Sequence, residues 1–219
     1  MTYASDQSLR GIWVKLEALR LRILNGDEGQ EMKAMQLHGE QQREQARSIL
    51  TSGAVTFEAA NAYLWRYCDS YQRLPEVLAF KATMNPREWW RLLGEAWTMC
   101  DNLAMHTEEL RRCLRDADRK QLDAMMTRYE RRRLRMLAGG ELTVYRGCYD
   151  CNRDGLSWSL SERIARGFPT LNRYRREGDV PLILVGKTDP KRAVLKTDRK
   201  EQELICADVR VTSETELTV

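Results

Sequence analysis

The first half of the chain carries apolar residues at helical spacing. Between Leu9 and Leu24 they recur every three or four positions, which predicts an amphipathic helix that ends at Asn25-Gly26. Residues 27–50 are rich in Gln and Glu and have few apolar positions, so they form either an exposed helix or a flexible connection. A further helix is predicted to begin at Thr56. Its apolar positions are Phe57, Ala60, Leu64 and Tyr67.

Two more helices are predicted before residue 139. Asn85-Pro86 has the pattern of an N-cap followed by proline at the first helical position, and Glu88 is spaced to return the capping bond. The apolar face of this helix contains Trp89, Trp90, Leu93, Trp97, Cys100 and Ala104. We interpret the tryptophans as core residues. The last helix runs from about Asp116 to Gly139-Gly140. Its apolar positions are Leu122, Met125, Met126, Tyr129, Met136 and Leu137.

From Glu141 onward the pattern changes to short β-branched segments separated by turn residues. The predicted strands are Leu142–Arg146, Pro181–Gly186, Arg192–Lys196, Glu203–Ala207 and Val209–Val211. Helices first and a sheet last indicate an α+β fold. We therefore divide the chain into a helical lobe, residues 1–138, and a β region, residues 139–219.

Composition and charge narrow the function classes. There are 36 basic and 32 acidic residues, and the small positive excess is concentrated in Tyr129–Arg135 and Asn172–Arg176. These runs are either solvated faces or a docking surface for nucleic acid or an acidic protein. No apolar run is long enough to span a bilayer, and the first residues lack the pattern of a secretory signal. We expect a soluble, cytoplasmic protein that does not bind membranes.

The six cysteines are scattered, so reduced thiols are expected rather than a disulfide framework. Cys148 and Cys151 have the spacing of half a zinc site, but no second pair follows, and no metal is assigned. The chain has no phosphate-binding loop, and its two histidines lie in the helical part. Hydrolase triads and zinc peptidases are therefore excluded.

Three short motifs follow one another in the β region. Tyr145-Arg146-Gly147 ends one strand, Ser157-Trp158-Ser159 begins the next, and Glu201-Gln202-Glu203 leads another. After Ser159, the sequence continues into a helical pattern with Ala165 and Phe168 three residues apart. In this order the motifs resemble the Arg, Ser-x-Ser and Glu-x-Glu signature of mono-ADP-ribosyltransferases of the cholera and clostridial toxin type. The resemblance covers roughly the last 80 residues and implies a small, mainly antiparallel core.

The resemblance implies NAD⁺ as the substrate and a role for each motif residue. Cleavage of the bond between nicotinamide and ribose passes through a cation, which the Glu203 carboxylate would stabilise while holding the ribose 2′-hydroxyl. Arg146 would bind the pyrophosphate with its planar guanidinium, and Gly147 would let the backbone approach the nicotinamide amide. Ser157 would bond the Glu203 carboxylate and keep it aimed.

The remaining motif residues have supporting roles in this interpretation. Glu201 lies two residues before Glu203, on the same face of a strand, and a glutamate there goes with arginine as the acceptor. Tyr145 and Ser159 are placed with the cofactor-binding residues, where Ser159 mainly supports its strand. Phe168 or Tyr174 would cover the nicotinamide ring by stacking, and simple core packing is an equal alternative for Phe168.

The sequence thus predicts a transferase that places ADP-ribose on a macromolecule, with a protein side chain favoured and a nucleic acid open as the acceptor. Only ten residues separate Arg146 from Ser157, fewer than in the toxins, so the N-terminal helices are expected to complete the cleft or to recognise the target. This compactness is similar to that of bacteriophage transferases, which suggests a bacterial host or defence component as the target. The alternatives are an NAD⁺ glycohydrolase and a non-enzymatic binding protein with a degenerate transferase fold.

Overall fold

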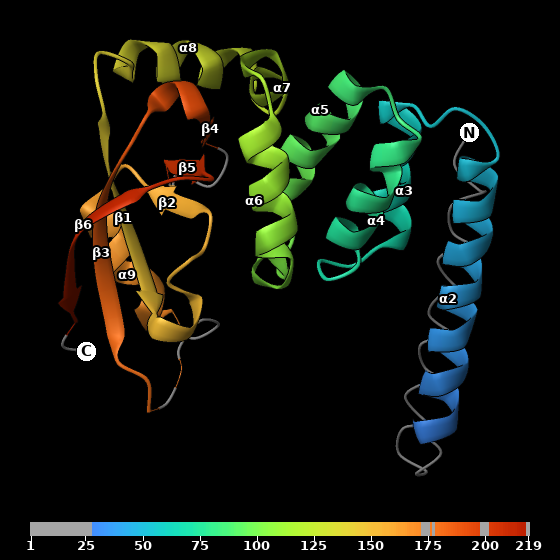
Figure 1. Ribbon diagram of the computed structural model, residues 1–219. Helices are drawn as coiled ribbons and strands as arrows, with labels where there is room; N and C mark the ends of the chain where they lie inside the picture. The colour runs from blue at the N-terminus through green and yellow to red at the C-terminus, as the bar shows by residue number, and fades with distance from the viewer. Residues whose placement is uncertain (1–27, 172–175, 177, 198–201, 218–219) are drawn as a thin grey trace, which may run out of the picture. The chain divides into compact units, whose positions relative to one another are not determined.

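The computed structural model describes residues 28–171, 176, 178–197 and 202–217 (Figure 1). Helix α2 (Glu28–Thr51) belongs to one unit, Met1–Ser52, and the rest of the chain, Gly53–Val219, forms a second compact unit. The sequence left residues 27–50 as either an exposed helix or a flexible connection. The helix is observed, and its described side chains are mostly exposed. The predicted helix Leu9–Leu24 lies outside the described residues.

Six α-helices precede the sheet in the second unit. They are α3 (Phe57–Tyr67), α4 (Arg73–Ala79), α5 (Pro86–Trp97), α6 (Thr107–Asp116), α7 (Arg119–Ala124) and α8 (Arg128–Leu137). The predicted N-cap Asn85 is confirmed, because its side chain accepts from Arg87 N, and Thr56, where a helix was predicted to begin, caps α3 by accepting from Ala59 N. The capping bond predicted for Glu88 is wrong, since its carboxylate accepts instead from the backbone N of Phe57. In the described part of the chain, no helix has both the length and the apolar character needed to cross a membrane.

Helix α5 is shorter than its apolar pattern predicts. It ends at Trp97, so Cys100 and Ala104 lie in the following segment. There, Asp101 N donates to the carbonyl oxygen of Ser70, and the Asn102 side chain donates to that of Tyr71. These long-range bonds replace the next helical turn. Trp89, Trp90 and Trp97 are all buried, as predicted.

The single helix predicted from Asp116 is observed as two, with α6 ending where it was expected to begin. Asp118 and Thr127 each form a capping box, and each therefore starts a new helix. Because Thr127 resets the helical phase, the predicted apolar stripe is wrong beyond it. Tyr129 is 61 % exposed and Met136 is 80 % exposed.

In the described residues, six strands form one antiparallel sheet in the order β4-β5-β2-β1-β3-β6. Their bounds are β1 (Leu142–Tyr149), β2 (Ser157–Ser159), β3 (Pro181–Thr188), β4 (Ala193–Lys196), β5 (Glu203–Cys206) and β6 (Arg210–Glu216). Helix α9 (Glu162–Gly167) packs against β1, β2 and β3. The α+β class and all five predicted strands are confirmed.

A buried ion pair fixes α8 against β4. Glu130 and Lys196 are 2 % and 5 % exposed at the side chain, and Oε2 of Glu130 lies 3.7 Å from Nζ of Lys196. The same carboxylate accepts from the backbone N of Thr127 and of Thr197, both at 2.8 Å. Its oxygens are therefore satisfied by the helix start and by the end of β4 together.

Replacing one member of this pair should strongly destabilise the fold. Glu130→Ala leaves Lys196 charged and buried without its carboxylate, and breaking such a pair costs about 3–5 kcal/mol. Urea unfolding would measure this free energy. The matched control is Arg115→Ala, which removes the exposed ion pair with Asp208 and should cost far less, because solvent screens an exposed pair. Equal losses in the two variants would contradict the prediction.

Candidate active site

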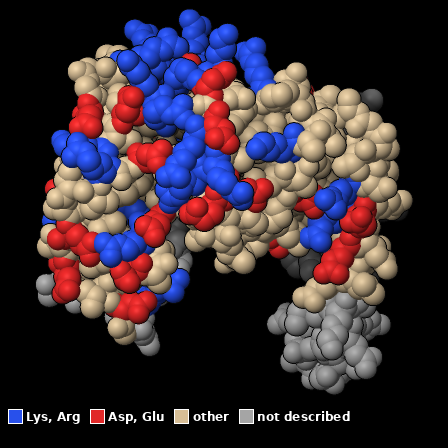
Figure 2. All heavy atoms as spheres, viewed as in Figure 1, with Lys and Arg blue, Asp and Glu red and all other residues tan. Residues whose placement is uncertain are grey.

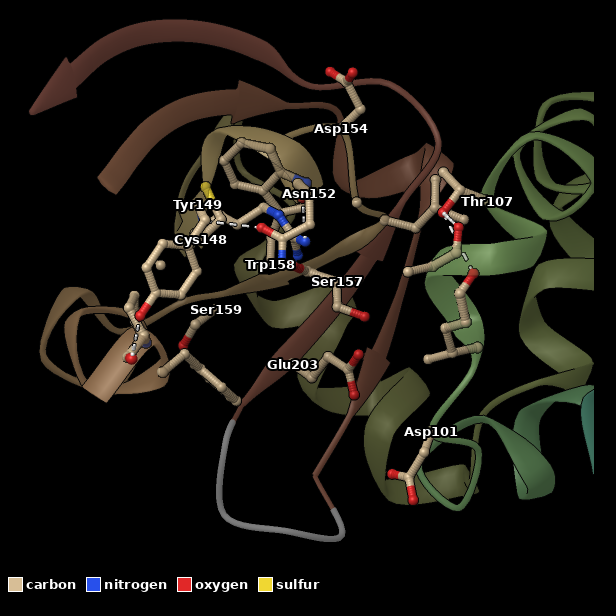
Figure 3. Close-up of a pocket in the computed structure, with 18 of the residues that line it drawn as sticks. Asp101, Thr107, Cys148, Tyr149, Asn152, Asp154, Ser157, Trp158, Ser159 and Glu203 are labelled. Carbon is tan, nitrogen blue, oxygen red and sulfur yellow. Dashed lines mark hydrogen bonds between the residues drawn. The ribbon is translucent and has the colours of Figure 1, made fainter. Parts of the chain in front are cut away.

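A pocket of about 830 Å³ lies within the unit Gly53–Val219, a size typical of ligand sites (Figure 3). One wall comes from β1, β2, the connection between them and the start of β5. The other wall comes from Tyr71 and from the segment between the end of α5 and the start of α6. Helices that precede the sheet in the sequence thus form part of the pocket.

Seven of the eight residues selected from the sequence line this one pocket. They are Tyr145, Arg146, Gly147, Ser157, Ser159, Phe168 and Glu203. The eighth, Glu201, lies outside the described residues, as does Tyr174. The motifs meet because β1, β2 and β5, which carry them, are adjacent in the sheet.

The strand register sets the motif side chains relative to one another. Ser159 pairs with Tyr145 on one side and with Glu203 on the other, so these three residues form a row across the sheet. Ser157 lies two residues along β2 and therefore on the same face, diagonal to Glu203. Figure 3 shows the side chains of Ser157 and Glu203 pointing into the same space.

The Glu203 carboxylate is held by a residue of the helical wall. The indole Nε1 of Trp97, at the end of α5, donates to Oε1 of Glu203 at 3.0 Å. Trp97 is 1 % exposed, so the sequence placed it correctly in the core but missed this second role. An apolar pattern locates an indole ring and carries no information on where its N–H points.

Arg146 is a half-buried arginine of the sheet wall, and its Nε is shielded from solvent. Its guanidinium donates to the carbonyl oxygens of Ser157 at 2.6 Å and Asn152 at 2.8 Å, and its buried Nε has no hydrogen-bond partner among the described residues. Burial lowers the pKa of Arg146, and the nearby Cys148 and Glu203 act in the opposite direction. Through these two hydrogen bonds the guanidinium holds the connection between β1 and β2 in place. The motif predicted pyrophosphate binding for Arg146 and did not indicate this structural role.

Two glycines allow the wall to pack. A Cβ on Gly147 would lie 1.9 Å from the carbonyl oxygen of Ala165, so the approach of α9 to β1 requires a glycine here. A Cβ on Gly155 would lie 2.0 Å from Nη2 of Arg146.

Phe168 follows α9 as its C-cap and is half-buried. This exposure is compatible with both predicted roles of Phe168, stacking on the nicotinamide ring and packing in the core.

Arg111 of α6 joins the helical wall to the sheet. It donates to the carbonyl oxygen of Ala207 at 2.5 Å and to that of Asp154. The wall that it fixes also brings Asp101 and Glu108 to the pocket, and Arg176 lines it as well. Sequence reasoning missed these residues, since only the fold places them beside the motifs.

The two buried thiols in the pocket, Cys100 and Cys148, are not candidate nucleophiles. Burial raises the pKa of Cys100 to about 12 and also raises that of Cys148, so both remain protonated at neutral pH. Within the described residues, no three His, Cys, Asp or Glu side chains group as a metal site requires. The charged groups of the pocket are therefore its carboxylates and guanidinium groups.

Gly155→Ala should destabilise the protein by displacing Arg146. The added methyl overlaps the guanidinium, which must then leave its carbonyl partners, and such overpacking typically costs about 1–3 kcal/mol. Chemical denaturation would measure the change. Gly140→Ala adds a methyl group where no atom lies within 4 Å and is the control. A Gly155→Ala protein as stable as this control would refute the packing argument.

Comparisons with known proteins do not supply a function for this arrangement. No protein-family model, no curated protein and no solved structure matches the chain. The support for any activity therefore comes from the pocket itself, in which residues from three adjacent strands and from the preceding helices bring an arginine side chain and a positioned carboxylate together.

Proposed function

We propose that the chain is a mono-ADP-ribosyltransferase, which transfers ADP-ribose from NAD⁺ to a macromolecular target, with an arginine side chain of a protein as the favoured acceptor. One observation carries the proposal. Residues of all three motifs, among them Arg146, Ser157 and Glu203, line the same pocket on neighbouring strands. An accidental set of short motifs has no reason to converge in this way.

The residues of the pocket fit the chemistry of NAD⁺. The dinucleotide has an anionic pyrophosphate, a cationic nicotinamide ring and flat aromatic groups. Arg146, with its unpartnered Nε, and Arg176 are the cations that line the pocket, and Tyr145 and Phe168 supply aromatic rings. Glu203 supplies the carboxylate. The volume of the pocket is sufficient for a ligand with more than one ring.

The reaction needs a negative charge beside the ribose. When the bond between nicotinamide and ribose breaks, its electron pair leaves with neutral nicotinamide and positive charge develops on the sugar. The Glu203 carboxylate stabilises this charge, and the Trp97 N–H keeps one of its oxygens in place. The acceptor then forms a bond to the ribose carbon and loses a proton. By resemblance, Glu201 is the base that takes it.

Acidic side chains on the helical wall support a cationic acceptor. Asp101 and Glu108 line the pocket opposite the strands that carry the motifs. An arginine side chain of a target, entering between the two walls, would be attracted by these carboxylates. A bacterial protein, alone or in a nucleoprotein complex, is the proposed target class.

Glu203→Gln should lower the transfer rate about 10²–10³-fold, because it removes the charge that stabilises the cation and leaves the shape of the pocket unchanged. The measurement is the transfer of label from NAD⁺ to macromolecules in a bacterial lysate, together with the release of free nicotinamide. Label that depends on Glu203 and resists nuclease supports a protein acceptor.

The other outcomes of this assay distinguish the alternatives. Label that nuclease removes would assign a nucleic-acid acceptor. Nicotinamide without label would point to an NAD⁺ glycohydrolase. A protein that forms neither product at any lysate concentration would be a binding protein, and unchanged activity in Glu203→Gln would remove Glu203 from the mechanism.

Trp97→Phe tests whether the helical wall positions the carboxylate. Losing a hydrogen bond to a charged acceptor should lower kcat for NAD⁺ cleavage about 10-fold and change KM by less than about 2-fold. Trp90→Phe is the matched control, since Trp90 is also buried in α5 but does not line the pocket. If both variants lose kcat equally, Trp97 acts only through the stability of the helix.

A further inference from the structure

Helix α8 presents a concentrated positive surface. Five of its ten residues are arginine, and Figure 2 shows basic side chains gathered over this helix at the top of the view. Its single acidic residue is Glu130, whose carboxylate is buried against Lys196 and the backbone of Thr127 and Thr197. The outward charge of the helix is therefore entirely positive.

Three of these arginines form a row that is not neutralised. Arg128, Arg132 and Arg135 are exposed and spaced by four and three residues, so they lie along one face of the helix. Within the described part of the chain, none of them forms an ion pair. Nearby arginines behave differently, since the exposed Arg115 binds Asp208 and the half-buried Arg119 binds Asp123, each at 2.6 Å.

The other two arginines of α8 have local partners. Arg131 donates to the carbonyl oxygens of Asp123 and Met126, so it terminates α7 and is structural. Arg133 donates to the hydroxyl of Tyr129, at 3.3 Å. Arg128, Arg132 and Arg135 are therefore the arginines of α8 for which the described residues provide no such partner.

An aromatic side chain lies beside this row. Tyr129 is exposed, and together with Arg128, Arg132 and Arg135 it lines a shallow surface hollow. An exposed ring among arginines provides a stacking surface for an unpaired base, and the guanidinium groups provide contacts for phosphates. An acidic protein would use the charges but would have no need of the ring.

We propose that this α8 surface, formed by Arg128, Tyr129, Arg132 and Arg135, binds single-stranded nucleic acid. The arginines contact the phosphates, and Tyr129 stacks on a base. The surface is preorganised, because Leu134 and Glu130 hold the opposite face of the helix in the core. This inference does not depend on the transferase activity and adds a partner class to it.

The test measures the binding of the full chain to fluorescent oligonucleotides by anisotropy at several salt concentrations. Single-stranded RNA, single-stranded DNA, a duplex of the same sequence and polyglutamate are the probes. We expect both single strands to bind more tightly than the duplex or polyglutamate. The triple variant Arg128→Ala, Arg132→Ala, Arg135→Ala should weaken binding at least 10-fold and reduce the salt slope by about 2, since each lost phosphate contact contributes about 0.7.

Two further variants separate specific from general effects. Tyr129→Ala should weaken single-strand binding about 5-fold or more, because base stacking on an aromatic ring is lost. A control triple variant, Arg87→Ala, Arg112→Ala, Arg163→Ala, removes the same charge from exposed sites on three other helices and should bind normally. Glu203→Gln should also bind normally, which keeps this test independent of catalysis.

Several results would overturn the proposal. These are unchanged affinity in the α8 triple variant, an equal loss in the control triple variant, and polyglutamate binding as tight as that of the oligonucleotides. Duplex binding that matches the single strands and ignores Tyr129→Ala would overturn the assignment to single strands. Circular dichroism of each variant confirms that the helices are retained.

Discussion

The Arg146 side chain in the wall of the pocket constrains the structure around it. Arg146 is half-buried with its Nε shielded from solvent, and a shielded charge is tolerated where hydrogen bonds replace its hydration. Those bonds end on the carbonyl oxygens of Asn152 and Ser157, so the connection between β1 and β2 is wound around the cation. Gly155 leaves the necessary space. The position of Arg146 therefore determines the position of β2 and of the serines that β2 carries.

The shortness of this connection has a second consequence. The seven residues between Tyr149 and Ser157 are occupied with Arg146 and cannot also build the opposite wall of the pocket. The helices that precede the sheet build it instead. Trp97 reaches the Glu203 carboxylate, and Arg111 ties α6 to the carbonyl oxygens of Ala207 and Asp154. The helical segment is thus part of the same site as the strands, although sequence composition changes sharply between them.

The sequence predicted best what local patterns determine. The strands were found because β-branched runs between turns are a local signal, and their adjacency then brought Arg146, Ser157 and Glu203 to one pocket. The predicted helix boundaries were wrong where a capping residue or a long-range hydrogen bond starts or ends a helix, as at Thr127. The role of Trp97 was out of reach, because a hydrogen bond across the fold leaves no trace in the spacing of apolar residues.

The buried pair in α8 has an electrostatic consequence at the surface. A buried ion pair is often no more stabilising than two apolar side chains of similar size, so stability alone does not account for Glu130 and Lys196. Turning the only acid of α8 inward does two things at once. It fixes the helix against β4, and it leaves no carboxylate of α8 on the outward side of the helix. The positive surface of α8 is therefore a product of the core beneath it.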